Sequence, residues 1–220
     1  MGLHREKESV VEYGRKLIAS GLTTGTGGNL SIHDPGQGRL LITPSAVAYD
    51  AMSPADVVVM DMDGEVVEGR RKPSSEWSFH VALYRKRPDV HAVVHTHSVY
   101  ATALACLHWE IPAVHYLVGF AGRKVPLAPY ATYGTKELAR NVAETIGPSN
   151  AVLLANHGLV SVGTDLAGAF HTAEEIEFVA RTYYLARAAG EPQLLSDDEM
   201  DRVIAKFKDY GPSAGTLDDE

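Results

Sequence analysis

Two histidines, His95 and His97, stand two positions apart near the end of the run 90–98, which is rich in β-branched and apolar residues. Such a run predicts a strand, and the side chains at i and i+2 of a strand point to the same face. The two imidazoles would then project side by side, as half of a zinc site does. A third histidine, His157, follows the apolar run 151–155. Each histidine alone would more simply be an ordinary packed residue, but the three together predict a metal site.

Three neutral imidazoles without a thiolate would leave zinc with one open position, which is typical of a catalytic site rather than a structural one. Such an ion can polarise a carbonyl or stabilise an enediolate. A reaction through a carbanion also needs a general base, and Glu76 is the candidate. It lies in the first turn of the helix expected after Pro73, and a carboxylate near zinc and a helix N-terminus stays ionised. The simpler role of Glu76 is to complement the helix dipole.

Loops rich in small residues surround these positions in the sequence. Residues 23–31 hold three glycines and three threonines, and glycine allows the positive φ that an anion-binding nest of N–H groups requires. A plain turn would have the same composition, and no Gly-Lys-Ser/Thr follows, so this is not a P-loop. The helix start at Ser74 and Ser75 also offers free N–H groups to an anion. The substrate expected from both features is a small phosphorylated carbonyl compound.

Length and composition fit one globular domain of 220 residues. The net charge is −8, from 20 Lys and Arg against 28 Asp and Glu, which argues against a nucleic-acid binder with a basic surface. The one cysteine, Cys106, lies in an apolar run and is expected to be a buried packing residue. The charged N-terminus does not resemble a signal peptide, and no apolar run approaches the roughly 20 residues that a bilayer span requires. We therefore expect a cytoplasmic protein.

Helices and strands alternate along the sequence, with hairpins between some strands. Hydrophobic periodicity and capping residues predict helices at 5–20, from Ser74 or Ser75 to Pro88, at 99–107, from 133–137 to 146, at 166–189, and from Ser196 through Phe207 to Tyr210. Strands are predicted at 30–33, 39–43, 57–61, 65–68, 90–98, 111–116, 125–128, 151–155 and 159–162. The expected fold is α/β: a single-domain αβα sandwich over residues 1–211, whose central mixed, largely antiparallel sheet is flanked by helices. The tail 212–220 is expected to be disordered.

Several motifs stand in the order found in the class II aldolases of the aldolase/epimerase superfamily, which the chain resembles over nearly its whole length. They are Gly25-Thr26-Gly27-Gly28-Asn29, Ile42-Thr43-Pro44-Ser45, Pro73-Ser74-Ser75-Glu76-Trp77, His95-Thr96-His97 and His157-Gly158. Shorter matches continue at 111–116, 128–132 and 206–211. The resemblance implies the same α/β fold and an aldehyde-lyase activity.

The resemblance also implies a role for each site residue. Zn²⁺, or another divalent cation such as Mn²⁺ or Co²⁺, would be held by His95, His97, His157 and Glu76. Substrate would displace Glu76, which then acts as acid and base. The phosphate would be bound by Gly28, Asn29, Ser45, Ser74, Ser75 and the backbone of Ala46. Tyr116, from a neighbouring subunit of a homotetramer with sites at its subunit interfaces, would protonate the aldehyde oxygen during aldol formation, and Tyr133 and Tyr210 would lie at the aldehyde end.

The implied reaction is the retro-aldol cleavage of a 1-phosphoketose to dihydroxyacetone phosphate and an aldehyde. The ketose would be L-fuculose-1-phosphate, which yields L-lactaldehyde, or alternatively 5-deoxyribulose-1-phosphate or 5-methylthioribulose-1-phosphate. Ribulose-5-phosphate 4-epimerases of this superfamily carry Asp at the positions of Glu76 and Tyr116, which favours an aldolase here. The same fold could also belong to a dehydratase for methylthioribulose phosphate or to a non-catalytic adducin-like protein. Ala46 stands where the family has Gly. Tyr133 and Asn156 stand where it has Phe and His, at the aldehyde end or its rim, so the identity of the aldehyde stays open.

Overall fold

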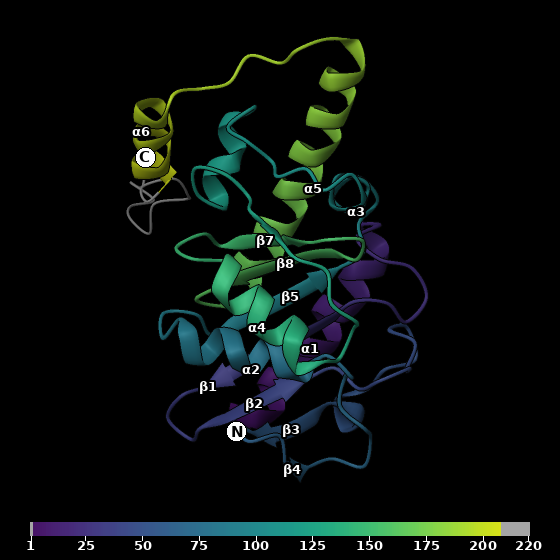
Figure 1. Cartoon of the computed structure of the whole chain (residues 1–220). Coiled ribbons are helices and arrows are strands. Elements are labelled where there is room, and N and C mark those ends of the chain that lie inside the picture. The colour runs from purple at the N-terminus through teal and green to yellow at the C-terminus, as the bar shows by residue number, and fades with distance from the viewer. Residues whose placement is uncertain (1, 208–220) are drawn as a thin grey trace, which may run out of the picture.

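The computed structural model describes residues 2–207, and its eight strands form one sheet (Figure 1). The strand order is β4-β3-β2-β1-β5-β8-β7-β6, and every neighbouring pair is antiparallel except β6 and β7. The strands are β1 (Asn29–Asp34), β2 (Arg39–Ile42), β3 (Val58–Asp61), β4 (Val66–Glu68), β5 (Ala92–Thr96), β6 (Leu127–Ala128), β7 (Ala151–Leu154) and β8 (Gly158–Gly163). The predicted mixed, largely antiparallel sheet is confirmed.

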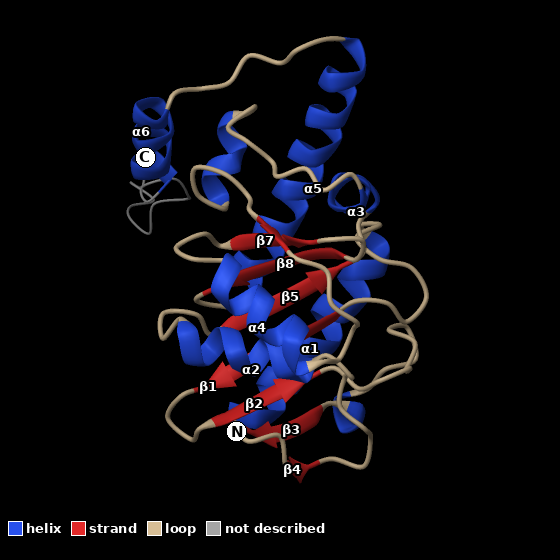
Figure 2. Cartoon of the chain, viewed as in Figure 1, coloured by secondary structure: helices blue, strands red, loops and turns tan. Residues whose placement is uncertain are grey.

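Helices cover both faces of this sheet (Figure 2). One face packs against α1 (Gly2–Ala19), α3 (Val99–Cys106) and α5 (Leu166–Ala189). The other packs against α2 (Trp77–Lys86) and α4 (Lys136–Thr145). The chain also forms α6 (Asp197–Phe207) and two short 3-10 helices, η1 (Pro54–Asp56) and η2 (Tyr116–Phe120). This is the αβα arrangement that the sequence predicts.

Except at the exposed edge strand β4, the sheet is buried on both faces, and alternate strand residues pack into the two cores. Val58 and Met60 of β3 pack under α2 and α4, whereas Val57 and Val59 belong to the core under α1, α3 and α5. In β5, Val93 lies on the α2 side and its neighbours lie on the other. This period of two also places His95 on the α2 side, where the site forms.

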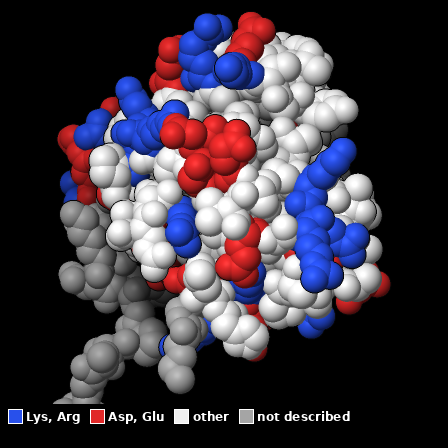
Figure 3. Space-filling view, turned by 90° about the horizontal axis from the view of Figure 1, so that it is seen from below, with Lys and Arg blue, Asp and Glu red and all other residues white. Residues whose placement is uncertain are grey.

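The C-terminal part of α5 extends past the sheet, and a long loop leads from it to α6 (Figure 1). There α6 packs against η2, with Phe207 stacked on Phe120 at 4.3 Å between ring centroids. Large apolar side chains remain exposed on this projecting part, among them Tyr116 of η2 and Phe178, Tyr184 and Leu185 of α5. From the opposite, β4 end, Figure 3 shows acidic and basic side chains side by side, and neither sign covers that face continuously.

Three local predictions are wrong. Residues 111–116 are not a strand: Ile111 forms only an isolated bridge with Val125, because Pro112 cannot donate to a ladder and the backbone turns there. The cap of α2 is Glu76, not Ser74 or Ser75, although the Glu76 N–H donates to the Ser74 hydroxyl at 3.3 Å.

The third wrong prediction concerns Cys106, which is exposed at the end of α3, since Ala101, Leu104 and Ala105 are the residues that this helix turns toward the core.

The predicted extension of the last helix to Tyr210 and the tail 212–220 lie outside the described residues. Within residues 2–207, no helix combines the length and apolarity needed to cross a membrane.

Candidate metal centre and active site

Neighbouring strands β5 and β8 bring the three predicted histidines together. His95 is on β5, His97 lies just beyond its end, and His157 immediately precedes β8, whose Leu159 pairs with Thr96. One nitrogen from each imidazole lies within 4.8 Å of the others. The Nε2 atoms of His95 and His97 are 3.1 Å apart, close to the roughly 3.3 Å expected for two ligands on one tetrahedral zinc ion. The cluster therefore has the spacing of a metal site.

A backbone hydrogen bond orients the His95 ring. His95 Nδ1 lies 2.9 Å from the Leu159 carbonyl oxygen, to which it donates, so Nε2 carries no proton and faces the cluster. Burial holds the pKa of His95 well below its ordinary value, which keeps the ring in the neutral form that binds metals. Gly158 permits the approach of the strands, because a Cβ at that position would overlap the Thr96 carbonyl oxygen.

Glu76 completes the donor set from the start of α2. Its Oε2 lies 3.4 Å from His95 Nε2, and its Oε1 lies 3.4 Å from His157 Nε2. Asn29 Nδ2 donates to Oε2 at 2.9 Å, whereas Oε1 is buried without a hydrogen-bond partner. Burial raises the pKa of Glu76, and His157 and Asn29 oppose that rise. A buried carboxylate oxygen that lacks a donor beside three imidazoles fits a divalent cation, which would satisfy it.

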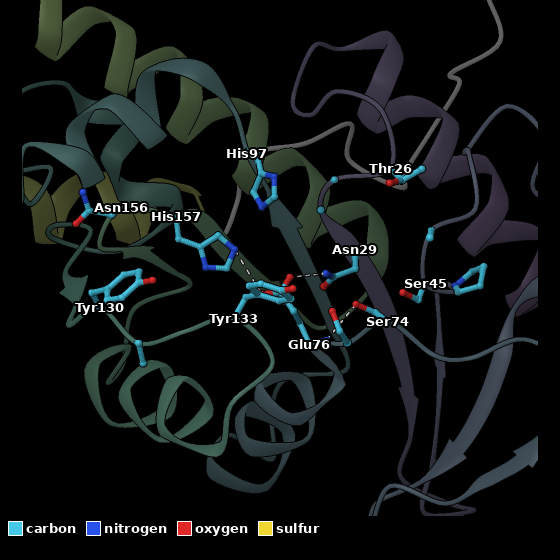
Figure 4. A pocket seen from close by; sticks show the side chains of 16 residues that line it. Thr26, Asn29, Ser45, Ser74, Glu76, His97, Tyr130, Tyr133, Asn156 and His157 are labelled. Carbon is cyan, nitrogen blue, oxygen red and sulfur yellow. Dashed lines mark hydrogen bonds and ion pairs between the residues drawn. The ribbon is translucent and has the colours of Figure 1, made fainter.

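A cavity of about 380 Å³ opens beside these residues (Figure 4). Every residue predicted to hold the phosphate lines this cavity, namely Gly28, Asn29, Ser45, Ala46, Ser74 and Ser75. Glu76, His97, His157 and Tyr133 line it as well. The loop that carries Ser45 and the loop that carries Ser74 are joined by two backbone hydrogen bonds. One runs from Ser74 N–H to Thr43 O at 3.0 Å, and the other from Ser45 N–H to Lys72 O at 2.9 Å. In Figure 4, Ser45 and Thr26 lie on the side of the pocket away from Tyr130 and Asn156.

The glycine-rich loop reaches the cavity in a conformation that requires glycine. Gly28 has φ +70°, and a Cβ there would stand 2.6 Å from the His95 carbonyl oxygen. The Tyr49 hydroxyl donates to the Gly28 carbonyl oxygen at 2.8 Å and supports the loop from the core. Ala46, where the family has glycine, also adopts a left-handed conformation, with φ +57°. Both loops are therefore held close to the cavity.

One predicted residue, Tyr116, is not part of this cavity within one chain. Tyr116 does not line it and lies half exposed at the start of η2, near His115 and Phe207. Tyr210 lies outside the described residues. At the end opposite Ser45, exposed Tyr130 and Tyr133 form part of the rim.

Sequence reasoning missed several residues. Thr26, Gly27 and Tyr130 line the cavity, although no role was predicted for them. Asn156, which the resemblance placed at the aldehyde end or its rim, also lines it, and its Oδ1 accepts from His108 Nε2 at 2.7 Å. His80, which no motif places at the site, lies behind Asn29, with 2.5 Å between His80 Nε2 and Asn29 Oδ1. Its position four residues after Glu76, on the same face of one helix, is the signal that could have found it.

The comparisons with known proteins agree with this geometry. Residues 8–184 match the family described as class II aldolase and adducin N-terminal domain. The chain is 53% identical to the 5-deoxy-D-ribulose 1-phosphate aldolase of Bacillus thuringiensis serovar kurstaki, over 96% of this chain and 99% of that protein. It is 44% identical to the 5-methylthioribulose-1-phosphate/5-deoxyribulose-1-phosphate aldolase of Rhodospirillum rubrum, over 94% of this chain and 93% of that protein.

A solved structure of an L-fuculose 1-phosphate aldolase superposes with a TM-score of 0.91 at 48% sequence identity, covering 93% of this chain and 96% of that one. The family match, these identities and the shared fold all lead to one assignment. The chain belongs to the class II aldolase and adducin N-terminal domain family, and within it to the class II aldolases.

Proposed function

We propose that the protein cleaves a 1-phosphoketose by a metal-dependent retro-aldol reaction, giving dihydroxyacetone phosphate and an aldehyde. One observation carries the proposal: three imidazole nitrogens and an unpartnered carboxylate oxygen converge beside a cavity lined by the glycine and serine loops. The first group suits a divalent cation and a ketose carbonyl, and the second suits a phosphate. The metal donors and the loops together therefore match the part that all candidate substrates share, which is the ketose carbonyl and its neighbouring phosphate.

His95, His97 and His157 would hold the cation, with Zn²⁺ as the proposed metal and Glu76 as a ligand until substrate displaces it. When bound, the cation supplies Lewis-acid polarisation of the ketose carbonyl and stabilises the charge that develops on it. Its donor set of three neutral nitrogens leaves the full positive charge for that task.

The chain's own residues would manage the protons. The C4 hydroxyl loses its proton, the C3–C4 bond breaks to release the aldehyde, and the electron pair moves into an enediolate. Glu76, whose Oε1 is free of hydrogen bonds, would take up a proton from solvent once substrate displaces it from the cation, and would then deliver that proton to C3 to complete dihydroxyacetone phosphate. Ser45, Ser74 and Ser75 would bind the phosphate, together with Gly28 and the second N–H of the Asn29 amide.

We assign the transfer of the C4 hydroxyl proton to Tyr116 of a neighbouring subunit, which would pass this proton to solvent during cleavage and return one to the aldehyde oxygen during aldol formation. Tyr116 is 49% exposed and does not line the cavity of its own chain. It begins η2, which packs against α5, and its ring contacts that of His115, which in turn contacts the exposed ring of Phe178 on α5. A phenol there can reach a cavity only if that cavity belongs to another chain, as a homotetramer with sites at its subunit interfaces allows. We place the enzyme in the cytoplasm on the basis of its one cysteine.

Two ketose substrates are supported about equally. The 53% identical relative favours 5-deoxyribulose-1-phosphate, and the 48% identical solved structure favours L-fuculose-1-phosphate. The deciding experiment compares kcat/KM on these two ketoses and on 5-methylthioribulose-1-phosphate, with released dihydroxyacetone phosphate as the readout. We expect measurable cleavage of at least one of them and loss of cleavage on treatment with a chelator.

The reverse direction separates an aldolase from an epimerase or a dehydratase. Only an aldolase joins dihydroxyacetone phosphate and L-lactaldehyde, because epimerases and dehydratases form no new carbon–carbon bond between two substrates. No condensation product and no cleavage of the three ketoses by zinc-loaded protein would refute the proposal.

A further inference from the structure

A chain of buried hydrogen bonds leads from Glu76 into the core. Asn29 Nδ2 donates to Glu76 Oε2 at 2.9 Å, and Asn29 Oδ1 lies 2.5 Å from His80 Nε2. On the other side of the ring, His80 Nδ1 lies 2.7 Å from Ser31 Oγ, which lies 2.6 Å from the Tyr84 hydroxyl. Ser31 and His80 are fully buried, and Asn29 and Tyr84 are 3% exposed. None of Ser31, His80 and Tyr84 lines the cavity.

Two elements, β1 and α2, supply the residues of this hydrogen-bond chain at regular spacings. Strand β1 contributes Asn29 and Ser31, which share a face as residues i and i+2. Helix α2 and its cap contribute Glu76, His80 and Tyr84 at intervals of four, which also share a face. The two faces are packed against each other, so residues from the strand and the helix alternate along the series of hydrogen bonds. Such regular alternation ties the catalytic carboxylate to the central sheet.

The ionised carboxylate fixes the direction of every bond. A carboxylate only accepts, so Asn29 must turn its NH₂ group toward Glu76 and its carbonyl oxygen toward His80. His80 must then carry its proton on Nε2, and its bare Nδ1 accepts from the Ser31 hydroxyl. The Ser31 oxygen in turn accepts from Tyr84. Burial lowers the pKa of His80 to about 3 and raises that of Tyr84, so both groups hold these protonation states at neutral pH.

We propose that His80 and Ser31 are positioning residues, which hold the Asn29 amide with its NH₂ group facing Glu76 and thereby fix the catalytic carboxylate. The inference rests on the proposed function for the role of Glu76. Without His80, the amide loses the donor that distinguishes its oxygen from its nitrogen and can rotate to set its oxygen against the carboxylate. A displacement of about 1 Å at a reacting group can cost about a hundredfold in rate.

The first test compares His80→Leu with His80→Gln. Leucine removes the donor to Asn29, whereas the glutamine amide can still supply one from a similar position. We expect kcat on 5-deoxyribulose-1-phosphate or L-fuculose-1-phosphate to fall about 10- to 100-fold in His80→Leu, with KM changing much less and zinc content unchanged. His80→Gln should recover most of kcat. Equal rates in the two variants, whether both lowered or both unchanged, would overturn the proposal.

A matched pair of serines separates positioning from general stability. Ser31 and Ser161 are both fully buried strand residues, and the Ser161 hydroxyl donates to the carbonyl oxygens of Val94 and Ala169. Ser31→Ala and Ser161→Ala each remove one buried hydroxyl. Only Ser31→Ala should lower kcat, by several-fold, at a comparable loss of thermal stability. A loss of kcat in both variants in proportion to the fall in melting temperature would count against the proposal.

A spectroscopic readout does not depend on activity. In zinc-free protein, nitrogen-15 NMR of the imidazole rings should show His80 as the neutral Nε2–H tautomer across the neutral pH range, and Ser31→Ala should weaken that preference. A wild-type ring in the Nδ1–H form would overturn the inference even in an active enzyme. If the predicted tautomer is found but zinc-loaded protein cleaves no ketose, the proposed function fails and the hydrogen-bond chain stands.

Discussion

At the scale of single residues, the two carboxylate oxygens of Glu76 have different surroundings. Asn29 holds one of its oxygens, while the other faces His157 without a hydrogen bond. This division leaves a fixed carboxylate with one oxygen available to a cation or a proton. The His95 imidazole, by contrast, is oriented by a backbone contact, from Nδ1 to the Leu159 carbonyl oxygen. Metal binding would therefore rest mainly on the imidazoles, whereas proton movement would depend on Glu76, which is also a ligand until substrate displaces it.

Glu76→Gln should separate those two tasks. Glutamine cannot take up or return a proton, but the three histidines still bind the cation. We expect zinc content to be retained and kcat to fall by about 10²- to 10⁴-fold, the usual contribution of a general acid or base. Metal analysis and steady-state rates measure the two properties, with Glu175→Gln on α5 as control. Undiminished turnover would reject the catalytic role.

His80 also predicts how stability depends on pH. Its folded pKa is about 3 against an ordinary 6.5, so below pH 6.5 the unfolded chain binds a proton there that the folded chain does not. Stability from this group is complete above pH 6.5 and falls as the pH drops toward 3, by about 1.4 kcal/mol per pH unit. Urea unfolding of zinc-free protein should show a weaker decline on acidification in His80→Gln than in wild type. Parallel pH profiles would contradict this expectation.

At the scale of elements, the site is the place where β5, β8, the glycine loop and the start of α2 meet. The loop lies so close to β5 that a Cβ on Gly28 would press on the His95 carbonyl oxygen. Loop and metal strand are therefore coupled through backbone contact. A substitution in the glycine loop should therefore alter the position of the imidazoles and with it the zinc affinity.

Gly28→Ala tests this coupling, with Gly25→Ala as control. Both glycines have positive φ, +70° and +62°, so each substitution should cost roughly 1–2 kcal/mol of backbone strain. Only position 28 also faces His95, since a Cβ on Gly25 would meet no atom within 4 Å. Gly28→Ala should weaken zinc binding and cleavage well beyond the effect of Gly25→Ala. Calorimetric stability and zinc affinity measure both effects, and equal zinc affinities would refute the coupling.

The sequence predicted most elements because alternation and helical periodicity are local signals. The histidine triad was also accessible, since i and i+2 of one strand share a face. Residues 111–116 were mistaken for a strand because their apolar pattern outweighed Pro112, and Cys106 was expected to be buried because composition does not show which side of a helix faces the core. The hydrogen-bond chain from Asn29 to Tyr84 could not be predicted, because it depends on how β1 and α2 dock.

At the scale of the whole molecule, the cavity and Tyr116 lie in different regions of one chain. Tyr116 of η2, together with Phe178, Tyr184 and Leu185 of α5, leaves an apolar surface exposed. Burying that surface between subunits would stabilise an oligomer and bring the phenol to a neighbour's cavity. The complete site would then exist only in the assembly.

Mixed oligomers test this arrangement. Tyr116→Phe and Glu76→Gln should each be nearly inactive alone. When the two are coexpressed with different tags and purified together, about a quarter of the sites should combine an intact Glu76 with an intact neighbouring Tyr116. We expect cleavage to recover to a similar fraction of wild type. Mixed oligomers as inactive as their parents would place Tyr116 outside the neighbour's site.

The central claim is that His95, His97 and His157 together hold one catalytic cation. Zinc titration of chelator-stripped protein, followed by both metal binding and ketose cleavage, tests it most directly. Cleavage should be absent without metal and should rise until one zinc is bound per chain. His157→Ala should lose tight binding and activity, whereas His171→Ala on α5 should behave as wild type. Full cleavage by metal-free protein, or wild-type zinc affinity in His157→Ala, would contradict the account.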